Sequence, residues 1–127
     1  MENWKMGFTI MLVEDYPVFL EMTEFALRTA GYSSIETYTN ACSALEKIHK
    51  AGPPDLIITD YDMPYMNGLE FAGMVSERYS HVKIIIITGD PEFVRNRYCR
   101  YTVIGKTNGD FCSGLIQIVD SLGLKSN

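Results

Sequence analysis

Features that would mark a secreted or membrane-spanning protein are missing from this sequence. Its 127 residues contain only three cysteines, which are widely spaced and form no Cys-x-x-Cys motif: Cys42, Cys99 and Cys112. A small, odd number of cysteines indicates reduced thiols and not a disulfide framework. No apolar run approaches the ~20 residues of a membrane span, and the first residues do not have the pattern of a signal peptide. We therefore expect a cytoplasmic location and no membrane segment.

Positive charge is also scarce. The chain has 11 Lys and Arg residues against 16 Asp and Glu residues, which gives a formal net charge of -5 at pH 7. Nucleic-acid-binding surfaces need clustered Lys and Arg residues to contact phosphates. Only Arg95, Arg97 and Arg100 lie close together, and we interpret them first as a solvated face. We therefore expect no direct binding of nucleic acid.

Repeats, low-complexity tracts and internal linkers are absent as well, so we expect a single domain over residues 1–127. This length is sufficient to bury an ordinary hydrophobic core without disulfides or metals. Residues 1–7 are interpreted as a short lead-in, and the ordered core is expected over about residues 9–122.

Strand-like and helix-like segments alternate along the chain. Apolar runs such as Leu56-Ile57-Ile58 and Ile84-Ile85-Ile86-Ile87 predict strands that are covered on both faces. We predict strands at 9–13, 34–38, 56–59, 82–88 and 101–105, followed by helices at about 17–30, 41–51, 69–79, 91–98 and 111–122. In the first helix, the residues expected to face the core are Phe19, Met22, Ala26 and Ala30. Five β–α units predict an α/β fold, a doubly wound parallel sheet with helices on both faces.

Reactive side chains follow four of the predicted strands. Glu14 and Asp15 follow the first strand, Asp60 the third, Thr88 ends the fourth, and Lys106 follows the fifth. The carboxyl ends of parallel strands meet at one edge, so the three carboxylates are expected to converge there. Such an oxygen-only cluster suits Mg²⁺, while a lysine and a hydroxyl suit an anionic group. Together these side chains indicate phosphoryl transfer to an aspartate.

The set of motifs resembles the receiver domain of bacterial two-component response regulators, the CheY-like family. The residues that carry the resemblance run from about Thr9 to Leu122 and are Glu14-Asp15, Asp60, Met63-Pro64, Gly68, Thr88-Gly89 and Lys106. Each motif alone is weak, but their order on the correct strand ends is a specific signal. The resemblance implies a five-stranded flavodoxin-like (βα)5 fold with strand order 2-1-3-4-5.

The resemblance also implies a role for each site residue. Asp60 would accept the phosphoryl group, Asp15 and Asp60 would bind Mg²⁺ together with the backbone carbonyl of Asp62, and Glu14 would act through water. Lys106 and the Thr88 hydroxyl would contact phosphoryl oxygens. Gly68 would supply backbone freedom in a turn. The implied partners are a sensor histidine kinase or phosphotransfer protein and a downstream protein or effector domain. The chain would not be an enzyme, but a self-phosphorylating and autodephosphorylating signalling domain.

The sequence departs from the family pattern at three places. Thr107 follows Lys106 where the family usually has proline, and we expect a trans bond there because a cis bond to a non-proline residue costs ~2.5–4 kcal/mol. Val103 stands where the family has an aromatic residue, with Tyr101 on the same face. Only 17 residues separate Thr88 from Lys106, fewer than usual. These departures fall on residues 91–122, where the three arginines also lie, so we expect an unusual partner surface or a homodimer through this face.

Two other functions fit the same residues. A haloacid-dehalogenase-type phosphatase would use Asp60 and Asp62, although there the acidic pair follows the lysine. A degenerate receiver would bind proteins without taking up phosphate. Asp62 and Asp90 lie two residues after Asp60 and Thr88, where the resemblance implies an influence on phosphoryl lifetime. Capping of a helix is an equal explanation for Asp90.

Overall fold

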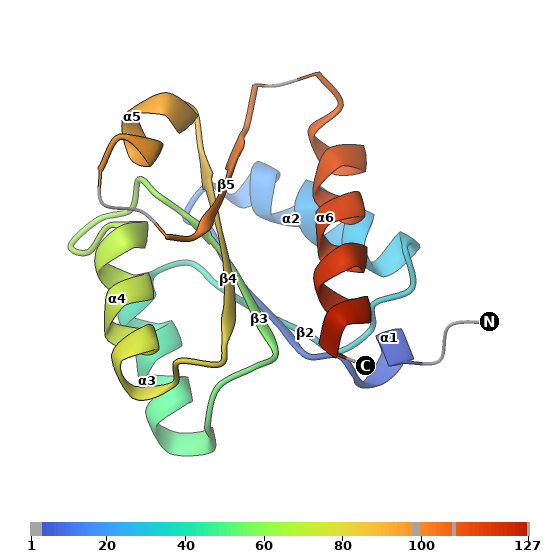
Figure 1. Cartoon of the computed structure of the whole chain (residues 1–127), viewed down its shortest axis with the longest axis horizontal. Coiled ribbons are helices and arrows are strands. Elements are labelled where there is room, and N and C mark those ends of the chain that lie inside the picture. Colours follow the sequence, from blue (N-terminus) through green and yellow to red (C-terminus); the bar gives the residue numbers. More distant parts are fainter. Residues whose placement is uncertain (1–3, 98–99, 108, 127) are drawn as a thin grey trace.

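The computed structural model of the protein describes residues 4–97, 100–107 and 109–126 and has a parallel sheet at its centre (Figure 1). The strands of this sheet are β1 (Ile10–Val13), β2 (Ile35–Tyr38), β3 (Leu56–Asp60), β4 (Lys83–Thr88) and β5 (Thr102–Gly105). The helices are α1 (Trp4–Gly7), α2 (Pro17–Thr29), α3 (Ala41–Ala51), α4 (Gly68–Arg78), α5 (Pro91–Arg95) and α6 (Phe111–Ser126).

The strands pair in the order β2-β1-β3-β4-β5, and every pair is parallel. The fold class and the strand order predicted from the sequence are confirmed. Because the chain places β2 on one side of β1 and β3 on the other, the order reverses at β1 and β3. Ligand sites of doubly wound sheets lie in the crevice beyond the carboxyl ends of the strands at such a reversal.

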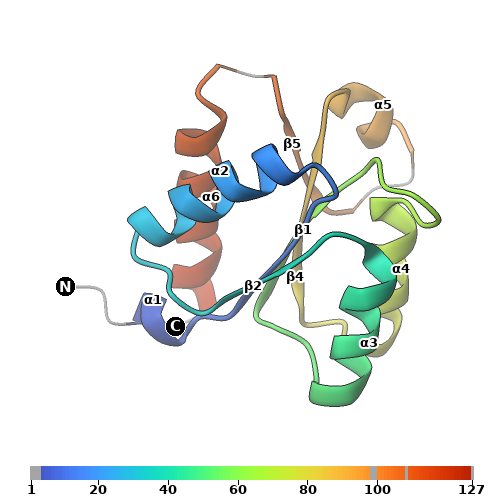
Figure 2. The ribbon, with the colours of Figure 1, turned by 180° about the vertical axis from the view of Figure 1, so that it is seen from behind.

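Helices cover both faces of the sheet (Figures 1 and 2). Successive strand residues point to opposite faces, so Ile84 and Ile86 of β4 pack toward α3, α4 and α5, whereas Ile85 and Ile87 pack toward α2 and α6. All residues of β1 and β3 are buried. Strands buried on both faces explain why these segments read as continuous apolar runs and not as alternating patterns.

Side-chain caps set the first residue of three helices. The side chain of Asn40 accepts a hydrogen bond from the backbone of Ser43, and that of Asp90 accepts one from Phe93. Asn67 and Glu70 form a reciprocal capping box at the start of α4. Each cap satisfies backbone N–H groups that the first helical turn leaves without partners. The capping explanation of Asp90 is thereby confirmed.

Two predicted helices differ from the observed ones. Met22 of α2 does not face the hydrophobic core. It is 42% exposed, whereas Thr23 and Leu27 of the same helix are buried. The other three residues predicted to face the core, Phe19, Ala26 and Ala30, are half-buried, so the core face of the helix is as expected except that Thr23 replaces Met22. Helix α5 ends at Arg95, earlier than the predicted end at Tyr98, which lies outside the described residues.

The lead-in contains a packed helix. In α1, the ammonium of Lys5 donates to the carbonyl of Ala30 at 3.0 Å, lies 3.3 Å from Asp120 and stands over the ring of Tyr32. The ring of Trp4 meets that of Tyr32 edge-on at 5.9 Å. Ordered packing therefore begins before residue 9.

Two further expectations concern cysteines and membranes. Cys42 and Cys112 are free thiols, and Cys99 lies outside the described residues. Among the helices of the described part of the chain, none has both the length and the apolar character needed to cross a bilayer.

Candidate functional site

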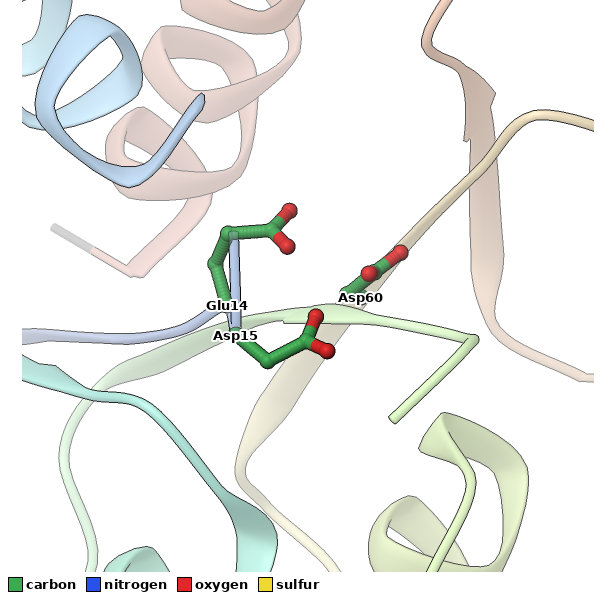
Figure 3. Close-up of side chains that lie close together, drawn as sticks. All are labelled: Glu14, Asp15 and Asp60. Carbon is green, nitrogen blue, oxygen red and sulfur yellow. The ribbon is translucent and has the colours of Figure 1, made fainter. Parts of the chain in front are cut away.

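The carboxylates of Glu14, Asp15 and Asp60 converge at the carboxyl edge of the sheet (Figure 3). Glu14 and Asp15 directly follow β1, and Asp60 is the last residue of the adjacent strand β3. One oxygen from each carboxylate belongs to a group whose atoms all lie within 4.8 Å of one another. Glu14 and Asp60 are buried, whereas Asp15 is exposed. The predicted acidic cluster therefore forms at the reversal of strand order.

Backbone contacts hold Glu14 in place. Its N–H donates to the carbonyl of Tyr38 at 2.9 Å, which extends the pairing of β1 with β2. Its carboxylate accepts a hydrogen bond from the backbone N–H of Tyr16 at 3.1 Å. Pro17 begins α2 at the next residue, so the chain turns sharply after Asp15.

Lys106 reaches the same edge from β5. Its N–H donates to the carbonyl of Thr88 at 2.8 Å, which fixes its backbone beside the end of β4. Its ammonium lies 3.0 Å from Glu14 Oε1 and 3.2 Å from Asp60 Oδ2. The lysine side chain is 23% exposed, so these ion pairs are largely shielded from water. The ammonium that is expected to contact a phosphoryl oxygen is therefore paired with two carboxylates in this structure.

Burial and charge change the protonation of this cluster. The pKa of Asp60 is raised from an ordinary value of 3.8 to about 7, first because the side chain is buried and second because Glu14 is negatively charged; Lys106 acts in the opposite direction. Burial lowers the pKa of Lys106, but its hydrogen bond to Glu14 and the charges of Asp60 and Glu14 outweigh burial, so its pKa is raised overall. Lys106 is paired with Glu14 and Asp60. When all three carboxylates of the cluster are ionised, this one ammonium does not balance their negative charge.

Such a donor set fits a hard divalent cation. All three side chains offer carboxylate oxygens, which Mg²⁺ prefers, and the excess negative charge favours any cation that enters. Asp62 is exposed in the loop after β3, and its predicted carbonyl contact stays a prediction.

Thr88 and Asp90 lie beside the acidic cluster. Thr88 is buried and follows Ile87, which pairs with Asp60 in the sheet. The Thr88 hydroxyl accepts a hydrogen bond from the N–H of Asp90 at 3.0 Å. Asp90 uses its carboxylate to cap α5. The hydroxyl is therefore oriented by the same turn that starts this helix.

Gly68 matters for a different reason from the one expected. Its φ is not positive, but a Cβ at this position would lie 2.5 Å from the carbonyl oxygen of Asp60 and 3.0 Å from Tyr61 Cα. Its N–H donates to the Tyr61 carbonyl at 2.8 Å. Gly68 thus allows the start of α4 to approach the backbone of Asp60. The strained backbone of this loop is instead at Tyr65, with φ 72°.

The departures on the β5 side have structural counterparts. The peptide bonds of the described residues are all trans, including the Lys106–Thr107 bond, as expected. Val103 is buried, and the Tyr101 hydroxyl contacts Ser76 Oγ at 3.2 Å. The guanidinium of Arg95 donates to the carbonyl of Val103 at 2.9 Å, so this arginine holds α5 on β5.

One neighbour of Lys106 is not predicted by the sequence. Helical spacing places Phe19 on the core face of its helix, and the structure shows in addition that the Lys106 ammonium lies 4.5 Å from the centroid of the Phe19 ring. The position of Phe19 in the first turn after Pro17 indicates this contact, because a helix that begins just after Asp15 has its first turn at the carboxyl edge of the sheet.

Fold and site together define a doubly wound α/β protein with a candidate metal site at the reversal of strand order. The chain belongs to the response regulator receiver domain family, whose model matches residues 10–101. The match ends before Lys106, so this residue lies outside the segment that the family model covers.

Known proteins of this family resemble the chain over most of its length. The response regulator TrrA of Thermotoga maritima, solved in complex with Mg²⁺-BeF, is 31% identical with a TM-score of 0.77, covering 90% of this chain and 97% of that one. The polar-differentiation response regulator DivK of Brucella anthropi is 29% identical over 98 residues, which cover 72% of this chain and 78% of the relative. CheY of Pseudomonas aeruginosa is 26% identical over 83 residues, covering 64% of this chain and 66% of that protein.

Other relatives are much longer. The chain spans 15%, 13% and 8% of the length of three curated relatives that it matches, two from Arabidopsis thaliana and the sensor protein TorS of Escherichia coli. Membership of the family therefore identifies a two-component signalling module, which occurs in proteins of very different length.

Proposed function

We propose that the chain receives a phosphoryl group on Asp60 in a Mg²⁺-dependent reaction and passes the signal to a protein partner. The observation that carries this proposal is the environment of Asp60. It ends a buried strand, has Glu14 and Asp15 oxygens within 4.8 Å, and has the Lys106 ammonium at 3.2 Å. Family membership supports a receiver over the phosphatase alternative.

The reaction is a displacement at phosphorus. A carboxylate oxygen of Asp60 forms a bond to phosphorus while the P–N bond of a phosphohistidine breaks, and the imidazole nitrogen keeps the bonding electron pair. With acetyl phosphate as donor, the bond to the acetate oxygen breaks instead. The ionised form of Asp60 is the nucleophile, so the raised pKa must be lowered again before reaction.

A bound Mg²⁺ ion would lower the pKa of Asp60, because its positive charge favours the ionised carboxylate. Asp15 and Asp60, with the Asp62 carbonyl, would hold Mg²⁺, and Glu14 would act through water; the bound ion would keep Asp60 ionised and neutralise phosphoryl charge. Lys106 would move its hydrogen bonds from Asp60 to a phosphoryl oxygen, and the Thr88 hydroxyl would donate to another. Most of this chemistry is positioning and charge neutralisation.

The partners follow from the family. We propose a histidine kinase or phosphotransfer protein as donor and a downstream protein or effector domain as target, with residues 1–127 acting as one cytoplasmic receiver domain that binds no nucleic acid directly.

The output surface or homodimer contact is proposed at residues 91–122. Arg97, whose guanidinium stands 4.2 Å from the Phe93 ring centroid, tests this face better than Arg95, which holds α5 on β5. If Arg97→Glu changes neither the association state of the protein nor its affinity for a partner, the assignment of the output surface to residues 91–122 is wrong.

Incubation with Mg²⁺ and acetyl phosphate, followed by intact mass measurement, tests the reaction. We expect one phosphate increment on the wild type and none on Asp60→Asn or when EDTA replaces Mg²⁺. Asp62→Asn keeps its backbone carbonyl and is expected to retain uptake, whatever it does to phosphoryl lifetime. Sustained turnover of a phosphomonoester that Asp62→Asn abolishes would favour the phosphatase. Uptake of neither phosphate nor beryllofluoride would favour a degenerate receiver.

A further inference from the structure

The ring of Phe19 covers Lys106. Phe19 lies in the first turn of α2 and is half-buried on the side of the sheet that α2 and α6 share (Figure 1). Lys106 arrives from the far end of the chain, and its ammonium stands 4.5 Å from the centroid of the ring. This distance is well inside the ~6 Å over which an aromatic face attracts a cation.

The ring is held from behind. The centroids of Phe19 and Phe111 are 5.0 Å apart with their planes inclined by 47°. Phe111 is buried and begins α6. The Thr23 hydroxyl, one helical turn further along α2, donates to the backbone carbonyl of Phe19 at 2.8 Å. Phe111 of α6 therefore packs against the ring, and Thr23 helps fix the turn of α2 from which the ring projects.

Among the residues that the structure describes, the ammonium therefore contacts two carboxylates and one aromatic ring. Its contacts to Glu14 at 3.0 Å and Asp60 at 3.2 Å depend on the charge of those groups. Metal binding and phosphorylation would both change that charge. The contact with Phe19 does not depend on it, so the ring can keep Lys106 at the site while its anionic partners change.

We propose that Phe19 is a positioning residue for Lys106, which it holds at the edge of the site in reach of a phosphoryl oxygen on Asp60. This inference rests on the proposed function, because the role of Lys106 does. The flexible four-carbon stem of a lysine otherwise allows its ammonium many positions in water. Loss of a partly desolvated cation–π contact is expected to slow phosphate uptake about 3- to 10-fold.

Phe19→Leu is the test variant, because it removes the aromatic face and keeps an apolar, helix-compatible side chain. Phe19→Tyr retains the aromatic face and is expected to behave as the wild type. Phe25→Leu is the matched control: it makes the same change in the same helix, where the side chain is 73% exposed. Thermal unfolding of all variants verifies that they are folded.

The first measurement needs neither metal nor phosphate. In the metal-free protein the ring current of Phe19 is expected to shift the NMR signals of the Lys106 side chain upfield. The shift should be lost in Phe19→Leu and kept in Phe19→Tyr and Phe25→Leu. Lys106 signals that are the same in Phe19→Leu and the wild type would overturn the inference, because the ring would then not lie over the ammonium.

The second measurement is the rate of phosphate uptake from acetyl phosphate, followed by intact mass. Slower uptake by Phe19→Leu alone supports the positioning role. Equal uptake by Phe19→Leu and the wild type would overturn this inference and leave the proposed function standing. If the wild type takes up no phosphate under any condition, the proposed function fails and the role of Phe19 fails with it.

Discussion

Replacing Asp60 by asparagine should make the metal-free protein more stable. The residue is only 4% exposed, and the pKa of its side chain is raised from 3.8 to about 7, chiefly by burial and by Glu14. Each unit of pKa corresponds to about 1.4 kcal/mol, so the ionised carboxylate costs the folded state on the order of 4 kcal/mol. Asparagine removes this charge but also removes an anionic partner of Lys106. We expect a net gain of about 2–4 kcal/mol at about pH 8.

The gain should depend on pH in a specific direction. Below about pH 4, Asp60 is protonated in both the folded and the unfolded state, and its charge has no effect on stability. Between about pH 4 and pH 7 the unfolded state releases this proton while the folded state keeps it, so wild-type stability is lost as pH rises. The advantage of Asp60→Asn should therefore grow across this window and level off above it.

Urea unfolding in EDTA at about pH 4.5, 6 and 8 measures the free energy of unfolding of each variant. For a domain of this size, the gain at the highest pH corresponds to roughly 8–15 °C in Tm. Asp62→Asn makes the same chemical change at an exposed position in the next loop and should have little effect. Saturating Mg²⁺ should raise wild-type stability and leave Asp60→Asn unchanged.

Two results would contradict a destabilising charge on Asp60. One is equal stability of Asp60→Asn and the wild type at the highest pH, which would mean that Asp60 is not held ionised at a cost. The other is an advantage that is as large at the lowest pH as at the highest, which would trace the effect to packing instead of charge.

Further substitutions test the loop and the amino-terminal helix. Gly68→Ala should destabilise by about 1–3 kcal/mol in urea unfolding, because its Cβ would overlap the Asp60 carbonyl; unchanged stability would mean that the turn can move at no cost. Tyr65→Gly should stabilise by about 0.5–1 kcal/mol in the same assay, because it relieves the positive φ, and a loss would contradict this. Trp4→Ala should destabilise by about 2–3 kcal/mol, since the ring packs against Gly123; a change near zero would show that α1 contributes little.

Much of the fold was predictable because its signals are local. Runs such as Ile84 to Ile87 predicted strands buried on both faces, and β4 contacts both hydrophobic layers. One residue of the predicted core face of α2, Met22, was wrong because an exposed Met22 and a buried Thr23 are equally compatible with helical spacing. Which face of a helix is buried depends on how it packs on its neighbours, and its own sequence leaves that choice open.

The site was predictable in composition and only partly in contacts. Parallel strands end at one edge, so Glu14, Asp15 and Asp60 were expected together, and their oxygens do gather within 4.8 Å. The requirement for Gly68 was expected, but its cause was not. Close approach of its Cα to the Asp60 backbone is a contact across a loop, whereas a positive φ is the usual reason for glycine in a turn.

The five β–α units and the carboxylates at the strand ends follow from local sequence, because periodicity, apolar runs and the residue after each strand are properties of adjacent residues. The contacts of Lys106 with Glu14, Asp60 and the ring of Phe19 join residues that are far apart in the chain, so they depend on how the elements pack. Phe19 and Lys106 are 87 positions apart, and their contact depends on the order of the strands and on α2 and α6 packing side by side.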